Sequence, residues 1–188
     1  MSPVLRQQEV GDRVRRLREK SGMSLRALAA RTDFSPSFIS QLENGLVSPS
    51  IHSMEKIANA LGESLSGFFT AIGPGEGSLV MRKKERGRLP SSWSQAEIES
   101  LSRGAQHRRL EPLLITLQPG GRSGKHPTPH RSEEFALVLK GKVLLRLGPD
   151  EYALRTDDSV ALLPGELRLW VNGSRASCQI LIVGLASP

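Results

Sequence analysis

The apolar residues of the first 70 positions recur at helical spacing, in short bursts separated by turn residues. Val10, Val14 and Leu17 fall at i, i+4 and i+7, which predicts an amphipathic helix that ends near Gly22. Four further helices are predicted in the same way, because each begins at a Ser that can cap its first turn and continues with apolar residues on one face. These caps and inward residues are Ser24 with Leu25, Leu28 and Ala29; Ser35 with Pro36, Ile39 and Leu42; Ser50 with Met54, Ile57 and Leu61; and Ser64 with Leu65, Phe68 and Phe69. The pattern predicts a compact domain of five short helices over residues 9–70.

The pattern changes after residue 70. Residues 71–92 contain a Gly- and Pro-rich break followed by the basic stretch Arg82–Arg88, and we expect a basic linker there. Beyond it, apolar residues come in short runs bounded by Gly, Pro, Asn and Asp, which is typical of the strands of an all-β barrel or sandwich. The predicted strands include Leu113–Leu117, Phe135–Leu139, Val143–Leu147, Ser159–Leu163, Leu167–Val171 and Gln179–Val183. We therefore expect a second domain, all-β, over residues 93–188.

Residues Ser24 to Glu43 have the spacing of a helix-turn-helix, in which two helices are joined by a three- or four-residue turn. Small Ala29 stands where the two helices approach each other. Asp33 stands in the turn at a position that favours a positive φ, which Asp tolerates better than most residues. This arrangement would allow the second helix to lie in a DNA major groove.

The same region resembles the Cro/repressor (XRE-type) helix-turn-helix family, over about residues 9–70. The matching segments are Gly11–Arg18, Ser24–Ala29, Ser35–Gly45 and Ser48–Ser50. They include Glu43-Asn44-Gly45, at which the third predicted helix ends. The resemblance implies that Pro36–Asn44 is the recognition helix, and that the protein binds double-stranded DNA. The chain has Leu25 where the family often has a Gln that contacts phosphate.

The candidate DNA-binding residues lie on this motif. We expect base-edge contacts from Ser37, Ser40 and Gln41, because the amide of Gln offers a donor and an acceptor that match the N6/N7 edge of adenine. Phosphate contacts are expected from Arg26, from Asn44 and from the amides at the helix N-terminus that Ser35 caps. The alternative is that these side chains form an ordinary solvated face.

The formal net charge of +7 is compatible with a polyanionic partner. The surplus is not concentrated in the helix-turn-helix, since residues 1–70 have 9 basic and 7 acidic side chains, residues 71–92 have 5 and 2, and residues 93–188 have 12 and 10. Charge alone therefore supports nucleic-acid binding only weakly. The basic stretch Arg82–Arg88 is either a contact to flanking phosphates or a solvated spacer.

The region His126–Asn172 resembles the cupin family, through His130–Gly141, Asp157-Asp158-Ser159, Leu163-Pro164-Gly165 and Asn172-Gly173. Together the two resemblances imply a two-domain α + β fold: an N-terminal five-helix DNA-binding bundle and a C-terminal all-β cupin barrel. An XRE-like domain followed by a small cupin is a known layout among regulators.

Metal-binding cupins hold their ion with two or three histidines and a glutamate. In this chain His130 and Glu134 match two of these positions, the first histidine position is Thr128, and the last falls on or beside Arg168. His126, two residues before Thr128, is the only histidine that could repair one position. We therefore expect neither a metal nor any other cofactor, and keep His126, His130 and Glu134 as weak metal candidates whose simpler role is that of polar loop residues.

The layout also resembles the hydroxypropylphosphonate epoxidases, iron enzymes that combine the same two domains. Their third iron ligand has no counterpart at its expected place here, so an enzyme is the weaker alternative. Instead, strand alternation would point Arg168 into the barrel with Glu134. A buried guanidinium there could hold an anionic small molecule in a bidentate fork, with His130, Glu134 and Arg168 as the ligand-binding residues. The alternative is that Arg168 faces solvent.

The function expected from the sequence is that of a sequence-specific transcriptional regulator controlled by a small-molecule effector. One recognition helix reads few base pairs, and the cupin resemblance implies pairing through a sheet face, so we expect a homodimer. Phe135, Leu137 and Leu139, opposite Glu134, could form that face or pack inside the barrel. A second alternative is a regulator whose cupin only dimerises.

Two features that the sequence lacks bear on where the protein is found in the cell. No apolar run is long enough to span a bilayer, and the residues around Met1–Gln8 lack the apolar core of a signal peptide. The single cysteine, Cys178, excludes an intramolecular disulfide and fits a half-buried thiol on a strand. We expect a cytoplasmic protein that does not contact membranes.

Overall fold

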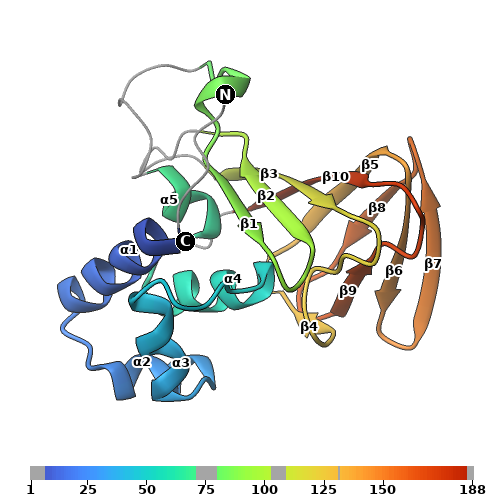
Figure 1. The fold of residues 1–188 in the computed structure, drawn as a ribbon. Helices are drawn as coiled ribbons and strands as arrows, with labels where there is room; N and C mark the ends of the chain where they lie inside the picture. Colours follow the sequence, from blue (N-terminus) through green and yellow to red (C-terminus); the bar gives the residue numbers. More distant parts are fainter. Residues whose placement is uncertain (1–6, 71–79, 103–108, 131, 186–188) are drawn as a thin grey trace.

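The computed structural model describes residues 7–70, 80–102, 109–130 and 132–185 (Figure 1). Its N-terminal part contains four helices of eight or more residues and one of six. Their bounds are α1 (Gln7–Lys20), α2 (Leu25–Thr32), α3 (Pro36–Glu43), α4 (Ile51–Ala60) and the short α5 (Leu65–Thr70). The predicted residues Val10, Leu28, Ile39, Met54 and Phe68 are all buried between these helices, whereas the side chain of Phe69 lies outside the described part.

The predicted caps hold the helices in place. The hydroxyl oxygens of Ser24, Ser35 and Ser50 each accept a hydrogen bond from the backbone N–H three residues later. Asp33 ends α2 in the left-handed conformation, with φ 51°. The chain can therefore reverse between α2 and α3 without a glycine, as its position in the turn predicted.

The recognition helix is tied to α1 by a buried carboxylate. The carboxylate of Glu43, which is 2% exposed, accepts hydrogen bonds from two side-chain nitrogens of Arg18, from Nε at 2.6 Å and from Nη2 at 2.9 Å. Arg15 approaches the same carboxylate at 3.4 Å. A carboxylate that is almost completely shielded from solvent is tolerated only because it is paired and hydrogen-bonded. This contact therefore fixes how α3 lies against α1.

The C-terminal part consists of two antiparallel sheets. The larger has the order β1-β2-β3-β10-β5-β8 and the smaller β4-β9-β6-β7. The strands are β1 (Arg88–Ser91), β2 (Ala96–Ser100), β3 (Leu110–Leu117), β4 (Thr128–Pro129), β5 (Glu134–Lys140), β6 (Lys142–Leu147), β7 (Asp150–Arg155), β8 (Ser159–Leu162), β9 (Leu167–Val171) and β10 (Cys178–Leu185).

The expected cupin barrel is formed by two sheets that do not close edge to edge. Among the described residues no strand of one sheet pairs with a strand of the other along its edge. Instead, the sheets are held together by the side chains between them, which include Ala136, Val138, Leu145, Trp170 and Ile180. Burial of the two inner faces replaces edge-to-edge closure as the source of cohesion. Cys178 was predicted to be a half-buried thiol on a strand, and it is fully buried on β10.

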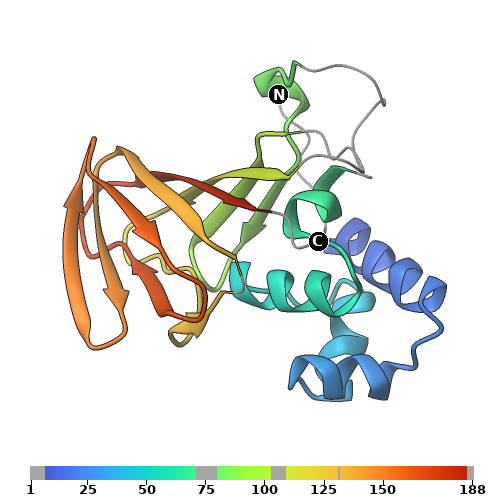
Figure 2. The same cartoon turned by 180° about the vertical axis from the view of Figure 1, so that it is seen from behind.

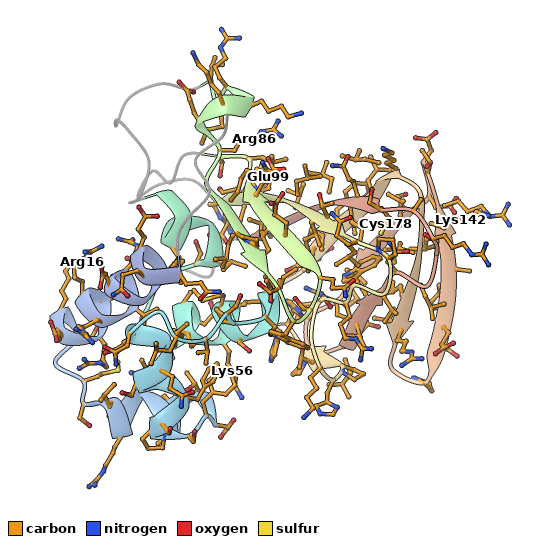
Figure 3. The ribbon with its side chains drawn as sticks, viewed as in Figure 1. Arg16, Lys56, Arg86, Glu99, Lys142 and Cys178 are labelled. Atoms are coloured by element: carbon orange, nitrogen blue, oxygen red, sulfur yellow. The ribbon has the colours of Figure 1, made fainter. Side chains whose placement is uncertain are left out.

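The predicted linker over residues 71–92 is too long at its C-terminal end, and its residues 71–79 lie outside the described part. Arg88–Ser91 is strand β1, which pairs with β2 and so belongs to the larger sheet. Two of the basic residues are engaged there: Arg88 pairs with Glu97, and Arg86 lies 3.6 Å from Glu99 (Figure 3). These contacts favour a structural role for Arg86 and Arg88 over phosphate binding.

Helix α4 lies between the helix-turn-helix and the sheets, as the two opposite views show (Figures 1 and 2). Its first turn meets the β domain, where the N–H of His52 donates to the carbonyl of Ser123 at 3.4 Å. Helix α5 packs against β2 and β3, and the buried apolar residues of helices and sheets form one contiguous cluster. None of the helices that the structure describes is long and apolar enough to cross a membrane.

The Glu43 contact generates a stability prediction. Replacing Glu43 by Gln removes the charge that neutralises buried Arg18, and we expect the free energy of unfolding in urea to fall by about 3 kcal/mol. Glu19, 61% exposed and 3.5 Å from the same arginine, provides the matched control. Glu19→Gln should change stability by less than about 1 kcal/mol; an equal loss in both variants would mean that Glu43 does not fix α3.

Candidate functional site

The outer face of the helix-turn-helix presents a row of polar side chains. Ser37, Gln41 and Asn44 on and after α3 are exposed, Ser40 is half-buried, and Arg26 on α2 is exposed. The apolar residues Ile39 and Leu42 point to the core from the opposite side of α3. The predicted DNA-binding residues are thus gathered on one accessible side of the motif.

Two of these predicted residues also have structural roles. Ser35 accepts a hydrogen bond from the N–H of Phe38 as the cap of α3. The amide of Asn44 donates to the carbonyl of Ser40 at 2.8 Å and accepts from Arg15 at 2.9 Å. Because these polar atoms already have partners within the protein, Ser37 and Gln41 have the side chains most available to an outside ligand.

Helix α4 contacts the turn of the motif through a charged residue. Lys56 lies 2.8 Å from the carboxylate of Asp33, and its ammonium group lies over the ring of Phe34 at 5.5 Å. The lysine lowers the pKa of Asp33 through a hydrogen bond and its charge. The residue that reverses the chain between α2 and α3 is therefore held by the helix that meets the β domain.

Inside the β domain, Arg168 and Glu134 form an ion pair between β9 and β5. The side chains of Arg168 and Glu134 are 2% and 11% exposed, so the prediction that Arg168 points inward with Glu134 is confirmed. Burial favours a raised pKa for Glu134, but His130 and Arg168 outweigh it and lower this pKa. Nη1 of Arg168 is buried and has no hydrogen-bond partner among the described residues, which leaves one donor of a buried cation unused.

The pair continues towards the helical domain through His130. Its Nδ1 lies 3.6 Å from Glu134 and 2.7 Å from Glu55 on α4. Burial alone would lower the pKa of His130, but the two carboxylates raise it to about 8. At neutral pH the imidazole is therefore mostly protonated, and charges of alternating sign run from Arg168 through Glu134 and His130 to Glu55.

The metal site of the cupin family does not fit these residues. Thr128, at the first histidine position, is the cross-strand neighbour of Arg168, so an alcohol and a guanidinium stand where two imidazoles would be needed. The guanidinium supplies a permanent positive charge next to Glu134 and has no lone pair for a metal. His126 is exposed and does not repair the set.

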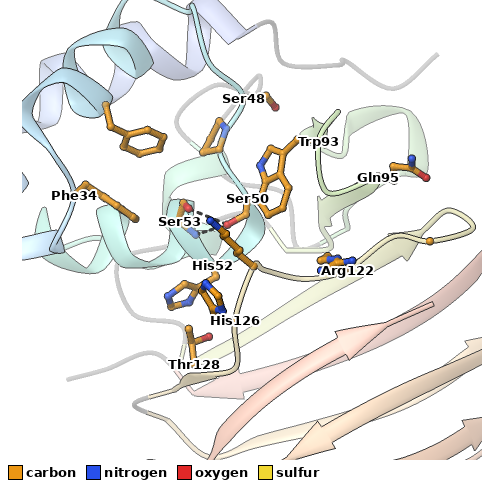
Figure 4. A pocket seen from close by; sticks show the side chains of 14 residues that line it. Phe34, Ser48, Ser50, His52, Ser53, Trp93, Gln95, Arg122, His126 and Thr128 are labelled. Carbon is orange, nitrogen blue, oxygen red and sulfur yellow. Dashed lines mark hydrogen bonds between the residues drawn. The ribbon is translucent and has the colours of Figure 1, made fainter. Parts of the chain in front are cut away.

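A cleft of about 950 Å³ opens between the two domains (Figure 4). Phe34 and His52 line it from the helical domain, and Trp93 and Arg122 line it from the β domain. His126 and Thr128 also line the cleft, whereas His130, Glu134 and Arg168 do not. The predicted ligand-binding residues are therefore separate from this cleft, and their side chains are largely buried.

The sequence analysis did not identify Glu55 or His52 as candidates. Their spacing, His-x-x-Glu on one face of a predicted helix, was a usable signal. Their contact with His130 was not visible, because it joins positions 75 residues apart in the chain. Lys125 and Trp93, which line the cleft, were not identified either, because the cleft forms only where the two domains meet.

The comparisons with known proteins agree with this architecture. Residues 14–68 match the helix-turn-helix family model, and residues 113–184 match the cupin domain model. The chain therefore combines a helix-turn-helix domain with a C-terminal cupin domain.

A relative of known class and two solved structures extend the likeness over nearly the whole chain. The HTH-type transcriptional regulator PuuR of Escherichia coli is 29% identical over 172 residues, 91% of each chain. An HTH_3 family transcriptional regulator from Vibrio cholerae has a TM-score of 0.74 at 19% identity, over 97% of this chain and 98% of that one. The hydroxypropylphosphonic acid epoxidase from S. wedmorenis has a TM-score of 0.50 at 21% identity, over 95% and 97%. The two structures show a shared fold.

The buried pair generates a prediction for a double-mutant cycle. Glu134→Gln leaves the charge of Arg168 uncompensated, and we expect it to lower the free energy of unfolding by about 3 kcal/mol. Arg168→Met should also destabilise the protein, but combining the two should cost less than their sum by at least about 1 kcal/mol. Urea unfolding of the four proteins measures this coupling, and strictly additive losses would contradict the pair.

Proposed function

We propose that this protein is a sequence-specific DNA-binding transcriptional regulator that acts as a homodimer and responds to an anionic small molecule. The observation that carries the proposal is the exposed polar face of α3 within an intact helix-turn-helix. Ser35 caps this helix, Asp33 reverses the chain before it, and Glu43 fixes it against α1. The likeness to regulators such as PuuR supports the same function.

The proposed DNA contacts are divided between bases and phosphates. Gln41 and Ser37 are exposed on α3 and would contact base edges, with Ser40 beside them at the more buried edge of the face. Arg26 and the amides at the N-terminus of α3 would contact phosphates. Asn44 would orient α3 through its bonds to Ser40 and Arg15, and add a phosphate contact from its exposed side.

The proposed effector carries a carboxylate or phosphate that binds Arg168. The unused Nη1 of this buried guanidinium supports the idea, because an anion would satisfy it with a charge-assisted hydrogen bond. Such a ligand would compete with Glu134 for the arginine and so change the partner that His130 prefers. Its effect would reach α4 through the contact between His130 and Glu55.

Helix α4 would then carry the change to the DNA-binding motif. Consecutive residues of this helix contact the β domain and the motif, since Glu55 lies against His130 and Lys56 against Asp33. A shift of α4 by a fraction of a turn would alter both contacts. The coupling expected from one such rearrangement is about 1–3 kcal/mol, enough to change operator affinity by one or two orders of magnitude.

The alternative of an epoxidase-like iron enzyme is the weaker one. The fold is shared with that enzyme, but Thr128 and Arg168 replace imidazoles at two of the positions that a cupin metal centre uses. A regulator whose β domain only dimerises remains the second alternative, and the unused donor of Arg168 favours effector binding over it.

Dimerisation is proposed through the outer face of the larger sheet. Phe135, Leu137 and Leu139 lie on the face of β5 opposite to Glu134, and Phe135 and Leu139 are about half exposed. Across β10 their neighbours are Val183 and Leu181, so the apolar surface continues on the adjacent strand. A second copy of the chain would cover this surface and place two recognition helices on one DNA.

DNA binding is tested by fluorescence anisotropy at ~150 mM salt, with DNA from the promoter region of the protein's own gene and scrambled DNA of equal length. We expect a preference of ~10³-fold or more for one promoter segment. Gln41→Ala should weaken that specific binding by about 1–3 kcal/mol while binding to scrambled DNA stays the same. Gln118→Ala, an exposed glutamine of the β domain, is the control. Equal binding of the wild-type protein to all promoter segments and to scrambled DNA would contradict the proposal.

The dimer is tested with two exposed aromatic residues. Phe135 and Tyr152 are each 45% exposed, but Tyr152 lies on β7 in the other sheet. We expect Phe135→Glu to convert the dimer to a monomer in light scattering after size exclusion and to weaken operator binding, because two charges would be buried against each other. Tyr152→Glu should remain dimeric. A dimeric Phe135→Glu variant would exclude this face.

A further inference from the structure

Three potential metal ligands from the two domains meet at the N-terminal half of α4. They are His52 and Glu55 of that helix and His130 of the β domain, and one ligand atom from each lies within 4.8 Å of the others. The two imidazole rings have centroids 6.5 Å apart. All three side chains are partly buried, so the cluster is shielded without being closed to an ion.

The helix geometry presents two of these ligands together. Residues three apart lie on the same face of an α-helix, so His52 and Glu55 project towards the same point of the β domain. The first turn of α4 is held against that domain by the bond from the N–H of His52 to Ser123. Backbone positions on both sides of the cluster are therefore fixed before any ion binds.

The imidazole of His52 has an unused ligand atom. Its Nδ1 is buried and has no hydrogen-bond partner among the described residues. A buried nitrogen without a partner is unfavourable unless something binds it, and an ion would supply that partner.

We propose that His52, Glu55 and His130 form a binding site for a divalent transition metal ion that joins the DNA-binding domain to the cupin domain. Two imidazoles and one carboxylate suit Zn²⁺ and its neighbours in the first transition row, with water in the remaining position. Ca²⁺ and Mg²⁺ prefer sets made of oxygen atoms only. Small rotations of the side chains bring ligand atoms that lie within 4.8 Å of one another to the ~2 Å metal–ligand distances of such a site.

This site differs from the metal position of cupins, because two of its three ligands come from the helical domain. His130 is common to both sets, but Glu134 is engaged by Arg168 and His126 lies outside the cluster. A bound ion would hold α4 against the β domain. It would thereby restrict the movement of this helix, whose Lys56 pairs with Asp33.

Cobalt titration of the chelator-treated, full-length protein tests the site, since Co²⁺ stands in for Zn²⁺ and reports ligand number through its visible absorption. We expect one Co²⁺ per chain at this site, its displacement by Zn²⁺, and a rise in the thermal unfolding midpoint with Zn²⁺. His52→Ala and Glu55→Gln should each weaken Co²⁺ binding at least tenfold, because even changes beyond the ligand shell cost roughly 10–100-fold.

A control variant separates this site from other imidazoles of the cleft. His126→Ala removes an exposed imidazole that lines the same cleft, and it should retain Co²⁺ binding. Far-UV circular dichroism of each variant in chelator confirms that it is folded. Absence of Co²⁺ binding by the wild-type protein would overturn the proposal. So would Co²⁺ binding of unchanged affinity in folded His52→Ala or Glu55→Gln.

Discussion

Helix α4 carries opposite charges on consecutive residues, and each charge is paired with a different part of the molecule. Glu55 lies 2.7 Å from His130 of the β domain, and Lys56 lies 2.8 Å from Asp33 in the turn before the recognition helix. A shift of this helix relative to one domain would therefore change its contact with the other. The communication between the two domains that we propose depends on this constraint.

The β domain adds a buried arginine to that constraint. In a metal-binding cupin the positive charge would come from an ion, and here it comes from Arg168 beside Glu134. Arg168 and His130 lower the pKa of Glu134, and the carboxylates of Glu134 and Glu55 raise the pKa of His130 to about 8. The remaining free donor of Arg168 is the reason why we propose that this charge also binds an anionic ligand.

Opposite faces of the same sheet serve different purposes. Strand β5 directs Glu134, Ala136 and Val138 into the space between the sheets, whereas Phe135, Leu137 and Leu139 lie on the outside. The alternation of a β-strand thus separates the proposed effector site from the proposed dimer surface by a single backbone layer. A ligand-induced change in the sheet would therefore act on the dimer as well as on α4.

The helices, their caps and the turn at Asp33 followed from the sequence, because apolar spacing, Ser caps and left-handed turns are decided within a few residues of each other. Strand alternation correctly pointed Arg168 and Glu134 inward for the same reason. By contrast, the sequence did not show that the two sheets of the cupin domain stay open at their edges, because sheet closure depends on pairings between distant strands. Strand β1 was assigned to the linker because its partner β2 was not recognised. Only the tertiary structure brought His52, Glu55 and His130 together, because packing of α4 on the β domain joins residues that no local rule relates.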